Sequence, residues 1–303
     1  MPRYLKTARL APKLALAAGV ATLAVSGALF AKELGDFSAP VSAEVGSDST
    51  LNTPANDGCP ILSPDGLSLY MATNRPGGAG GLDIWVAQRE TTTSGWGPPA
   101  PLPFPINTGA NEYCPDPVRG KRLFFIRAPV GTMNGDIYLT RLHKDGYDEP
   151  TNLGPNINSA AQEWSPSYFE DEVGNEILYF SSTRAGTQDI YASVNFGPAQ
   201  PVSELNTGMD DARPNVRHDG REIVFDSTRA PNLGGPDLWI ATRESIADAW
   251  SPPEHLETLS SMAPDTRASL SWDGTFLLFG SSRVPGEGSS DIYVSTRPRI
   301  TGR

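Results

Sequence analysis

Residues 176–193 read EILYFSSTRAGTQDIYAS, and this stretch decides how the rest of the chain is interpreted. It contains an apolar run, two small polar residues, an arginine, a short loop with glycine, and then Asp-Ile-Tyr. Versions of it occur five times, and the aspartate that opens the last apolar run recurs at intervals of 53, 53, 48 and 54 residues. A fixed period of this size indicates a repeat architecture. The aspartates are Asp83, Asp136, Asp189, Asp237 and Asp291.

Each repeat is predicted to form four short strands. Aromatic and β-branched residues lie between turn residues, as at 223–225 and 238–240, which is typical of strands. The pairs Asp65-Gly66 and Asp273-Gly274 fit a tight hairpin between the first two strands. Prolines near the start of the last strand suit a solvent-facing outer strand. Five such sheets arranged radially form an all-β fold, a five-bladed β-propeller of four-stranded antiparallel blades.

The two ends of the repeat region complete each other. Residues 37–53 resemble residues 196–207, which form the end of a repeat, and here the beginning is absent. Residues 291–297 form the beginning of a repeat whose end is absent. We therefore expect the N-terminal strand to pair into the last blade and close the ring, which removes an exposed strand edge. Residues 32–303 are interpreted as one propeller domain.

The first 31 residues differ from the rest. Four cations within residues 3–13 precede an apolar run at 14–30, and Ser26-Gly27-Ala28 is the best cleavage site. This pattern is typical of a secretory signal peptide, and an uncleaved N-terminal anchor is the alternative. No other apolar stretch is long enough to span a bilayer. The expected location is periplasmic or secreted, with membrane contact only through such an anchor.

The charge of the chain restricts its partners. The formal net charge is −11, and it becomes −15 without residues 1–31 because four cations and no acids are lost. A polyanion is repelled by this charge, so nucleic acid and anionic lipid headgroups are poor partners.

Two cysteines, Cys59 and Cys114, are predicted to form a disulfide. An even number of cysteines in an exported protein favours a bridge. Both occupy the same repeat position in adjacent blades, two residues after an acid and before a proline. Inner strands converge at the axis, so the pair can come within bridging range. Two buried thiols are the alternative.

Every repeat carries one acid and one arginine in register. The acid follows an Asn-Thr-like corner by four residues, and the arginine follows the second strand. One interpretation is structural, with Arg–carboxylate pairs at the blade junctions. The other is an acidic ring at the channel mouth that holds a polar ligand or a cation such as Ca²⁺. The arginines are Arg75, Arg127, Arg184, Arg229 and Arg283.

The two positions after each acid vary between repeats and provide the candidate site. Flat side chains and cationic forks beside carboxylates suit a sugar or a peptide, although simple packing is the alternative interpretation. The predicted ligand-binding residues are Asp57, Glu112, Tyr113, Glu163, Trp164, Asp211, Arg213, Asp265 and Arg267.

Other chemistry has little support in the sequence. The three histidines are isolated, and no HExxH, Cys/His metal spacing or G-x-S-x-G elbow occurs. A glycosidase needs two carboxylates at a set separation. An acid present in all repeats is better explained by the repeat, and the acids peculiar to one blade, Asp116 and Asp226, have no assignable partner.

The repeat resembles the WD40-like repeat called PD40, found in the propeller of the periplasmic protein TolB and in many exported bacterial proteins. The resemblance rests on Asp211-x-x-Pro214, His-Asp-Gly at 218–220, Val-Phe-Asp-Ser-Thr-Arg at 224–229 and Asp-Leu-Trp at 237–239. It covers residues 37–297 and implies a propeller that serves as a scaffold or binding module. TolB-like proteins have six blades and a separate α/β domain, whereas this chain has five repeats and no such domain.

We therefore expect an exported, non-enzymatic propeller that binds protein or glycan through its channel face, without a required cofactor. The alternative is a glycoside hydrolase-like enzyme that uses paired carboxylates.

Overall fold

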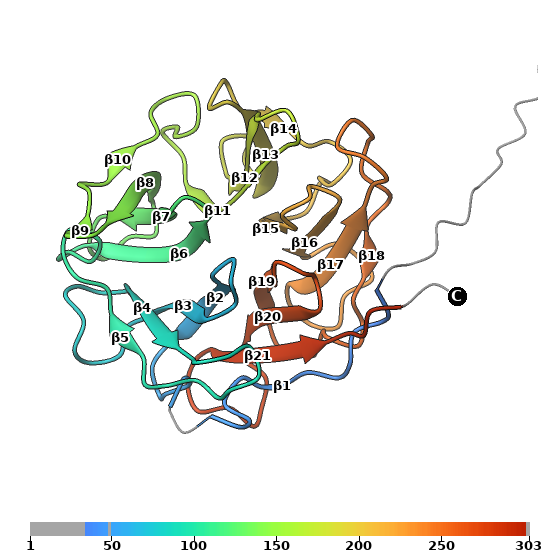
Figure 1. The fold of residues 1–303 in the computed structure, drawn as a ribbon. Coiled ribbons are helices and arrows are strands. Elements are labelled where there is room, and N and C mark those ends of the chain that lie inside the picture. The colour runs from blue at the N-terminus through green and yellow to red at the C-terminus, as the bar shows by residue number, and fades with distance from the viewer. Residues whose placement is uncertain (1–33, 48–49, 301–303) are drawn as a thin grey trace, which may run out of the picture.

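The computed structural model describes residues 34–47 and 50–300, which form five antiparallel sheets around a central axis (Figure 1). The prediction of an all-β, five-bladed propeller is confirmed, and no described residue is helical. No helix within the described ranges could therefore cross a membrane. The predicted signal segment, residues 1–31, lies outside the described residues.

Each blade has four strands that follow one another outward from the axis. The inner strands are β2 (Asp57–Leu62), β6 (Asn111–Val118), β11 (Glu163–Glu170), β15 (Asp211–Val216) and β19 (Asp265–Leu270). The second strands are β3 (Ser68–Thr73), β7 (Arg122–Ala128), β12 (Glu176–Ser182), β16 (Glu222–Ser227) and β20 (Phe276–Ser281). The third strands are β4 (Asp83–Gln88), β8 (Asp136–His143), β13 (Asp189–Val194), β17 (Asp237–Thr242) and β21 (Asp291–Thr296).

The outer strands are only two residues long. They are β5 (Ala100–Pro101), β10 (Thr151–Asn152), β14 (Gln200–Pro201), β18 (Glu254–His255) and β1 (Val41–Ser42). The second blade adds a short strand, β9 (Gly146–Tyr147), which also pairs with β8. Very short outer strands, two of them ending in proline, limit the edge available for pairing with another chain.

The ring is closed by the N-terminal strand, as predicted. Strand β1 pairs antiparallel with β21, with Val41 opposite Val294 and Ser42 opposite Tyr293 (Figure 1). The side chain of Asn52 adds to the closure because its Oδ1 accepts from the backbone N–H of Ile292 at 2.7 Å and its Nδ2 donates to the carbonyl of Ile292 at 3.2 Å. The last blade is thus built from both ends of the described chain.

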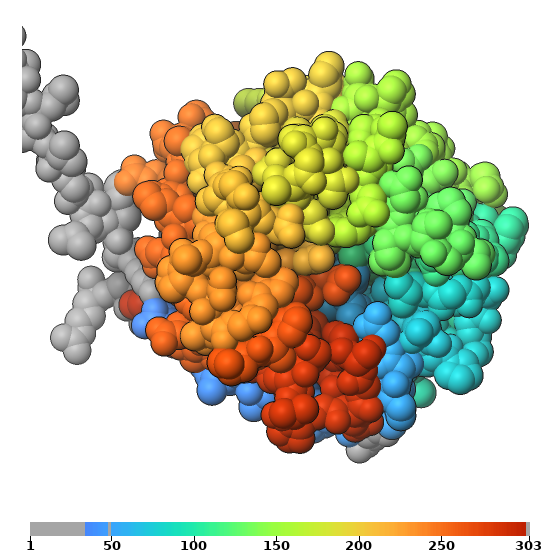
Figure 2. All heavy atoms as spheres, turned by 180° about the vertical axis from the view of Figure 1, so that it is seen from behind, coloured from blue at the N-terminus to red at the C-terminus, as the bar shows by residue number. Residues whose placement is uncertain are grey.

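Apolar side chains of neighbouring blades fill the wedges between them. One large side chain from the middle of each second strand is completely buried, and these are Met71, Phe125, Phe180, Phe225 and Phe279. Each lies opposite an aromatic residue of the third strand, as Phe225 does with Trp239. Five repeats of this packing bring the blades into close contact around a central hollow (Figure 2). Area removed from water at these wedges is the main stabilising term.

Candidate functional site at the channel

In each blade, the repeated acid at the start of the inner strand is buried and forms an ion pair with the arginine of the same blade. This ion pair is called the clamp. Glu112 is 0% exposed, and its carboxylate accepts from the backbone N–H of Thr108 at 3.0 Å and from the Thr108 hydroxyl at 2.6 Å. Arg127 donates to the same carboxylate through Nε at 2.9 Å. The Arg127 guanidinium also donates to the carbonyls of Pro105 and Ile106, which belong to the linker from the previous blade. One ion pair therefore fastens an inner strand, a second strand and the incoming linker together.

The same clamp occurs in all five blades, and it corrects the prediction of an acidic ring that contacts a ligand. All five acids are 0% exposed, so no ligand can reach them. A buried carboxylate needs a hydrogen-bonded cationic partner, and each acid has one. The pairs are Asp57–Arg75, Glu112–Arg127, Glu163–Arg184, Asp211–Arg229 and Asp265–Arg283. Within the described residues, no three His, Cys, Asp or Glu side chains form a group that could hold a metal.

Two residues beyond each acid, the backbone changes direction. The register between inner and second strands shifts there in every blade, which is a β-bulge. The residue at this position has a positive φ in each case: Cys59 49°, Cys114 47°, Ser165 48°, Arg213 53° and Arg267 58°. Glycine adopts this conformation at least cost, yet none of the five is glycine. The bulge turns these five side chains towards the axis, where they line one cavity.

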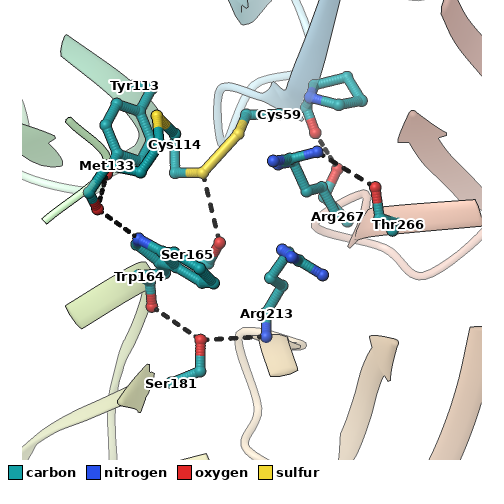
Figure 3. The surroundings of a disulfide bond; sticks show 12 residues. Cys59, Tyr113, Cys114, Met133, Trp164, Ser165, Ser181, Arg213, Thr266 and Arg267 are labelled. Carbon is teal, nitrogen blue, oxygen red and sulfur yellow. Dashed lines mark hydrogen bonds between the residues drawn. A yellow bond between two sulfur atoms is a disulfide. The ribbon is translucent and has the colours of Figure 1, made fainter. Parts of the chain in front are cut away.

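These five side chains and the residues after them narrow the channel to a throat. The cavity that they line holds only about 30 Å³, and four of its lining residues are the prolines Pro60, Pro115, Pro166 and Pro214. Proline fixes φ and keeps the wall rigid. Cys59 and Cys114, from the neighbouring strands β2 and β6, are joined in a disulfide in the wall of this throat, with a Cα–Cα distance of 4.9 Å (Figure 3).

A larger pocket lies next to the throat, at the end of the channel where the inner strands begin; this end is called the mouth. It has a volume of about 240 Å³. Arg213 and Arg267 turn their guanidinium groups towards the space between the disulfide and Trp164 (Figure 3). The pocket is lined by Tyr113, Cys114, Met133, Gln162, Trp164, Ser165, Arg213 and Arg267. The four variable residues predicted from the sequence thus meet in one pocket, without the five acids.

Tyr113 and Trp164 both form part of the pocket wall, but they differ in how far they are buried. The Tyr113 hydroxyl and the Trp164 indole Nε1 both donate to the carbonyl of Met133 at 3.0 Å (Figure 3). Tyr113 is only 2% exposed and belongs to an apolar cluster around the disulfide. Burial raises the pKa of its hydroxyl to about 12. The prediction that both rings are free to stack on a ligand is corrected for Tyr113, whereas Trp164 remains half-buried at the pocket wall.

Arg213 and Arg267 share a single buried carboxylate. Asp226 is 1% exposed; its Oδ2 pairs with Nη1 of Arg213, and its Oδ1 accepts from the backbone N–H of Arg267 at 2.9 Å. Burial raises the pKa of Asp226, and the charge of Arg213 is the main opposing cause. Burial and the neighbouring Arg213 lower the pKa of Arg267 to about 10, so Arg267 is still cationic at neutral pH.

The guanidinium of Arg267 makes no ion pair with a described carboxylate. Its Nη1 donates to the hydroxyl of Thr266 at 3.2 Å, and no carboxylate oxygen of the described chain lies within ion-pair distance. Arg213 packs over the Trp164 ring at 5.4 Å from the ring centroid, a favourable cation–π geometry. The pocket therefore combines one aromatic wall, a fixed cationic fork and a second cation that is not neutralised.

Asp116, the other acid peculiar to one blade, links two inner strands. Its Oδ2 accepts from the backbone N–H of Tyr168 in the next blade at 2.8 Å, and burial raises its pKa to about 7. Ser167 and Asn215 make the same contact at the next two junctions, to Val216 and Leu270. Sequence reasoning missed this link, although a polar residue four positions after the acid is its signal.

The other end of the channel, called the base, is covered. Three side chains from the turns between inner and second strands meet there. The His218 ring stacks on Trp272 at a centroid distance of 4.1 Å, and the Arg119 guanidinium lies 4.2 Å from the Trp272 centroid. Arg119 and Trp272 come from the second and fifth blades, which are not neighbours, so this stack spans the axis. The pocket is consequently open at the mouth and obstructed below.

Sequence reasoning also missed Met133 and Gln162 as lining residues. Met133 comes from the loop between β7 and β8, and Gln162 precedes β11. Met133 lies in an irregular loop, so no local signal marks it. Gln162 directly precedes the repeated acid Glu163, so the register could have placed it at the same end of the channel.

Comparisons with known proteins identify the fold. No protein-family profile and no curated protein matches the sequence. An α-L-arabinofuranosidase from Lactobacillus brevis superposes with a TM-score of 0.57 at 14% identity, covering 85% of this chain and 94% of that chain. A thermostable family-43 glycoside hydrolase gives 0.54 at 12% identity, covering 84% and 92%. An endo-1,4-β-xylanase from Bacteroides thetaiotaomicron gives 0.50 at 13% identity, covering 82% and 96%. The chain thus has the five-bladed propeller fold of these proteins.

Proposed function

We propose that this protein is an exported, PD40-like propeller that binds one residue of a glycan in the mouth pocket, without hydrolysing it. The observation that carries the proposal is the pocket itself: about 240 Å³, with Trp164 on one wall and Arg213, Arg267 and Gln162 as polar groups. Ligand sites commonly combine an apolar wall with a few fixed polar groups. This volume lies below the about 300–1,000 Å³ of pockets for drug-sized ligands and suits a single ring.

The absence of accessible acids in the pocket supports binding over hydrolysis. None of the described residues that line it is a carboxylate. Asp116 and Asp226 are buried, and each accepts hydrogen bonds from backbone N–H groups of the next blade. A glycosidase of the usual kind needs two carboxylates that flank the bond to be broken. Export and the strong negative charge also favour a glycan over nucleic acid.

A glycoside hydrolase-like enzyme is the second candidate, and the comparison structures favour it. The chains named as an arabinofuranosidase, a family-43 glycoside hydrolase and a xylanase share this fold over most of their length. Fold alone does not transfer an activity. The named proteins nevertheless make arabinose- and xylose-containing glycans the first ones to test.

The proposal is tested by screening the purified protein against a glycan panel while measuring released sugar in the same wells. Trp164→Ala is expected to weaken binding about tenfold or more, because stacking on an aromatic face is lost. Trp272→Ala is the matched control: it removes another half-buried tryptophan at the base and should leave binding within about twofold. Both variants should melt cooperatively.

Two outcomes would overturn the proposal. Equal losses in Trp164→Ala and Trp272→Ala would place the site elsewhere. Release of sugar by the unmodified protein, abolished by Asp116→Asn or Asp226→Asn in a folded variant, would establish the enzyme instead.

A further inference from the structure

The two channel arginines differ from every arginine of the blade clamps. Each clamp arginine pairs with its own buried carboxylate. At the mouth pocket, Asp226 pairs with the guanidinium of Arg213 and accepts from the backbone N–H of Arg267, so the Arg267 guanidinium has no ion pair within the described chain. Arg267 lies half-buried beside another cation without a carboxylate of its own in the described chain. A charge in such a place is unfavourable unless it is paired.

The backbone supports a role for these side chains beyond packing. Arg213 and Arg267 both have positive φ, which costs an ordinary residue free energy that glycine avoids. The same bulge position is Cys59, Cys114 or Ser165 in the other blades, so the fold itself does not require arginine. An unfavourable backbone conformation that carries a functional side chain points to a site.

We infer that the mouth pocket selects an acidic sugar, a uronate whose carboxylate lies against the guanidinium groups of Arg213 and Arg267. This inference rests on the proposed function and names the class of its ligand. A ligand carboxylate gives the Arg267 guanidinium the anionic partner that the described chain does not supply. An arginine fork matches the planar geometry of a carboxylate and can bind it through two parallel hydrogen bonds.

The other residues that line the pocket indicate how the rest of the sugar lies. The sugar ring lies between the carboxylate site and Trp164, and Gln162 lies within the same cavity to bond a hydroxyl. A neutral sugar fills the same volume but leaves Arg267 unpaired, so we expect it to bind more weakly. Phosphate backbones are disfavoured because the whole chain carries a net charge of −11.

The test compares oligosaccharides that end in glucuronate or galacturonate with matched ones that end in glucose or galactose. Calorimetric titration of the purified protein should show at least about tenfold tighter binding of the uronates. Arg267→Gln should remove this preference, so that the uronate and the matched neutral sugar bind with affinities within about twofold of each other. Arg119→Gln is the matched control, because it deletes one exposed cation at the base and should change neither affinity by more than about twofold. Arg267→Lys, which keeps the charge without the fork, should give an intermediate value.

A second measurement uses only the unmodified protein, so its result does not depend on whether a variant folds. For the unmodified protein, raising the salt concentration should weaken uronate binding more than neutral-sugar binding, because the carboxylate contact is partly screened. Equal affinity for uronate and neutral sugars would overturn the inference while leaving glycan binding intact. Binding of a peptide C-terminal carboxylate, lost in Arg267→Gln, with no sugar bound, would overturn both the inference and the proposed function.

Discussion

Two positions on each inner strand, two residues apart, behave in opposite ways. The first is always an acid, always 0% exposed and always paired with the arginine of its own blade. The second always has the same positive φ but carries cysteine, serine or arginine. The comparison shows that the fold repeats the contact that holds a blade together and varies the side chain that faces the axis. The constant acid position therefore belongs to the scaffold, and the variable position two residues later belongs to the candidate site.

The largest expected effect comes from breaking a clamp. Glu163→Ala should lower the free energy of unfolding by about 3 kcal/mol or more, because it leaves Arg184 without its carboxylate and removes the bonds from Ser159 and Ser182. Ser165→Ala, two residues along β11, should cost less than about 1 kcal/mol, since it loses only one weak bond to the Cys114 sulfur. Urea unfolding of both variants measures the difference.

Glu163→Gln serves as the control, because it keeps the shape and part of the hydrogen bonding and should be less destabilising than Glu163→Ala. Similar losses for Glu163→Ala and Ser165→Ala would mean that the clamp is not what distinguishes the two positions.

The second effect concerns the disulfide. The double variant Cys59→Ala with Cys114→Ala should lose about 2–4 kcal/mol of unfolding free energy, because the bridge no longer restricts the unfolded chain. The junction between the first two blades is sensitive because Ile61 occupies the position where Asp116, Ser167 and Asn215 link the next three junctions. The bridge takes the place of that missing polar link.

Thermal melting with and without reductant checks this prediction. Reductant should lower the melting temperature of the unmodified protein and leave the double variant unchanged. Two titratable thiols in denatured, unreduced protein would contradict the bridge.

The smallest effect is a change in pH dependence at Asp116. Its pKa is about 7 in the folded protein, above the ordinary value of 3.8, so the folded state binds the proton more tightly than the unfolded state. The stabilisation is complete below pH 3.8 and is lost as the pH rises towards 7. Asp116→Asn keeps an oxygen for the Tyr168 N–H and cannot ionise, so we expect it to gain at least about 1 kcal/mol over the unmodified protein between pH 5 and pH 8.

Asn215 shows that an amide is accepted at this position, because its Oδ1 accepts from the N–H of Leu270 at 2.8 Å. The reverse change, Asn215→Asp, should therefore introduce a new loss of stability with rising pH. Parallel stability curves for the unmodified protein and Asp116→Asn from pH 5 to 8 would count against a raised pKa.

The fold could be predicted from the sequence because the repeat fixed the register. The same register placed Tyr113, Trp164, Arg213 and Arg267 on one wall, and the structure brings these four together. The register shows which end of the channel a side chain lies at, but it does not show how deeply that side chain is buried. The register predicts that the acids and Tyr113 contact a ligand, but their burial depends on contacts with the linker and the next blade, which no spacing within one repeat describes. Met133 reaches the pocket through an irregular loop, so periodicity gave no information about it.

The stack of Arg119, Trp272 and His218 at the base has a consequence for the glycan binding that we propose. A tunnel open at both ends accepts the middle of a chain and allows it to slide through. A blind pocket with room for one ring admits only a chain end or a side branch, and the ligand leaves by the way it entered. Affinity for a glycan should then depend on the number of its free termini rather than on its length.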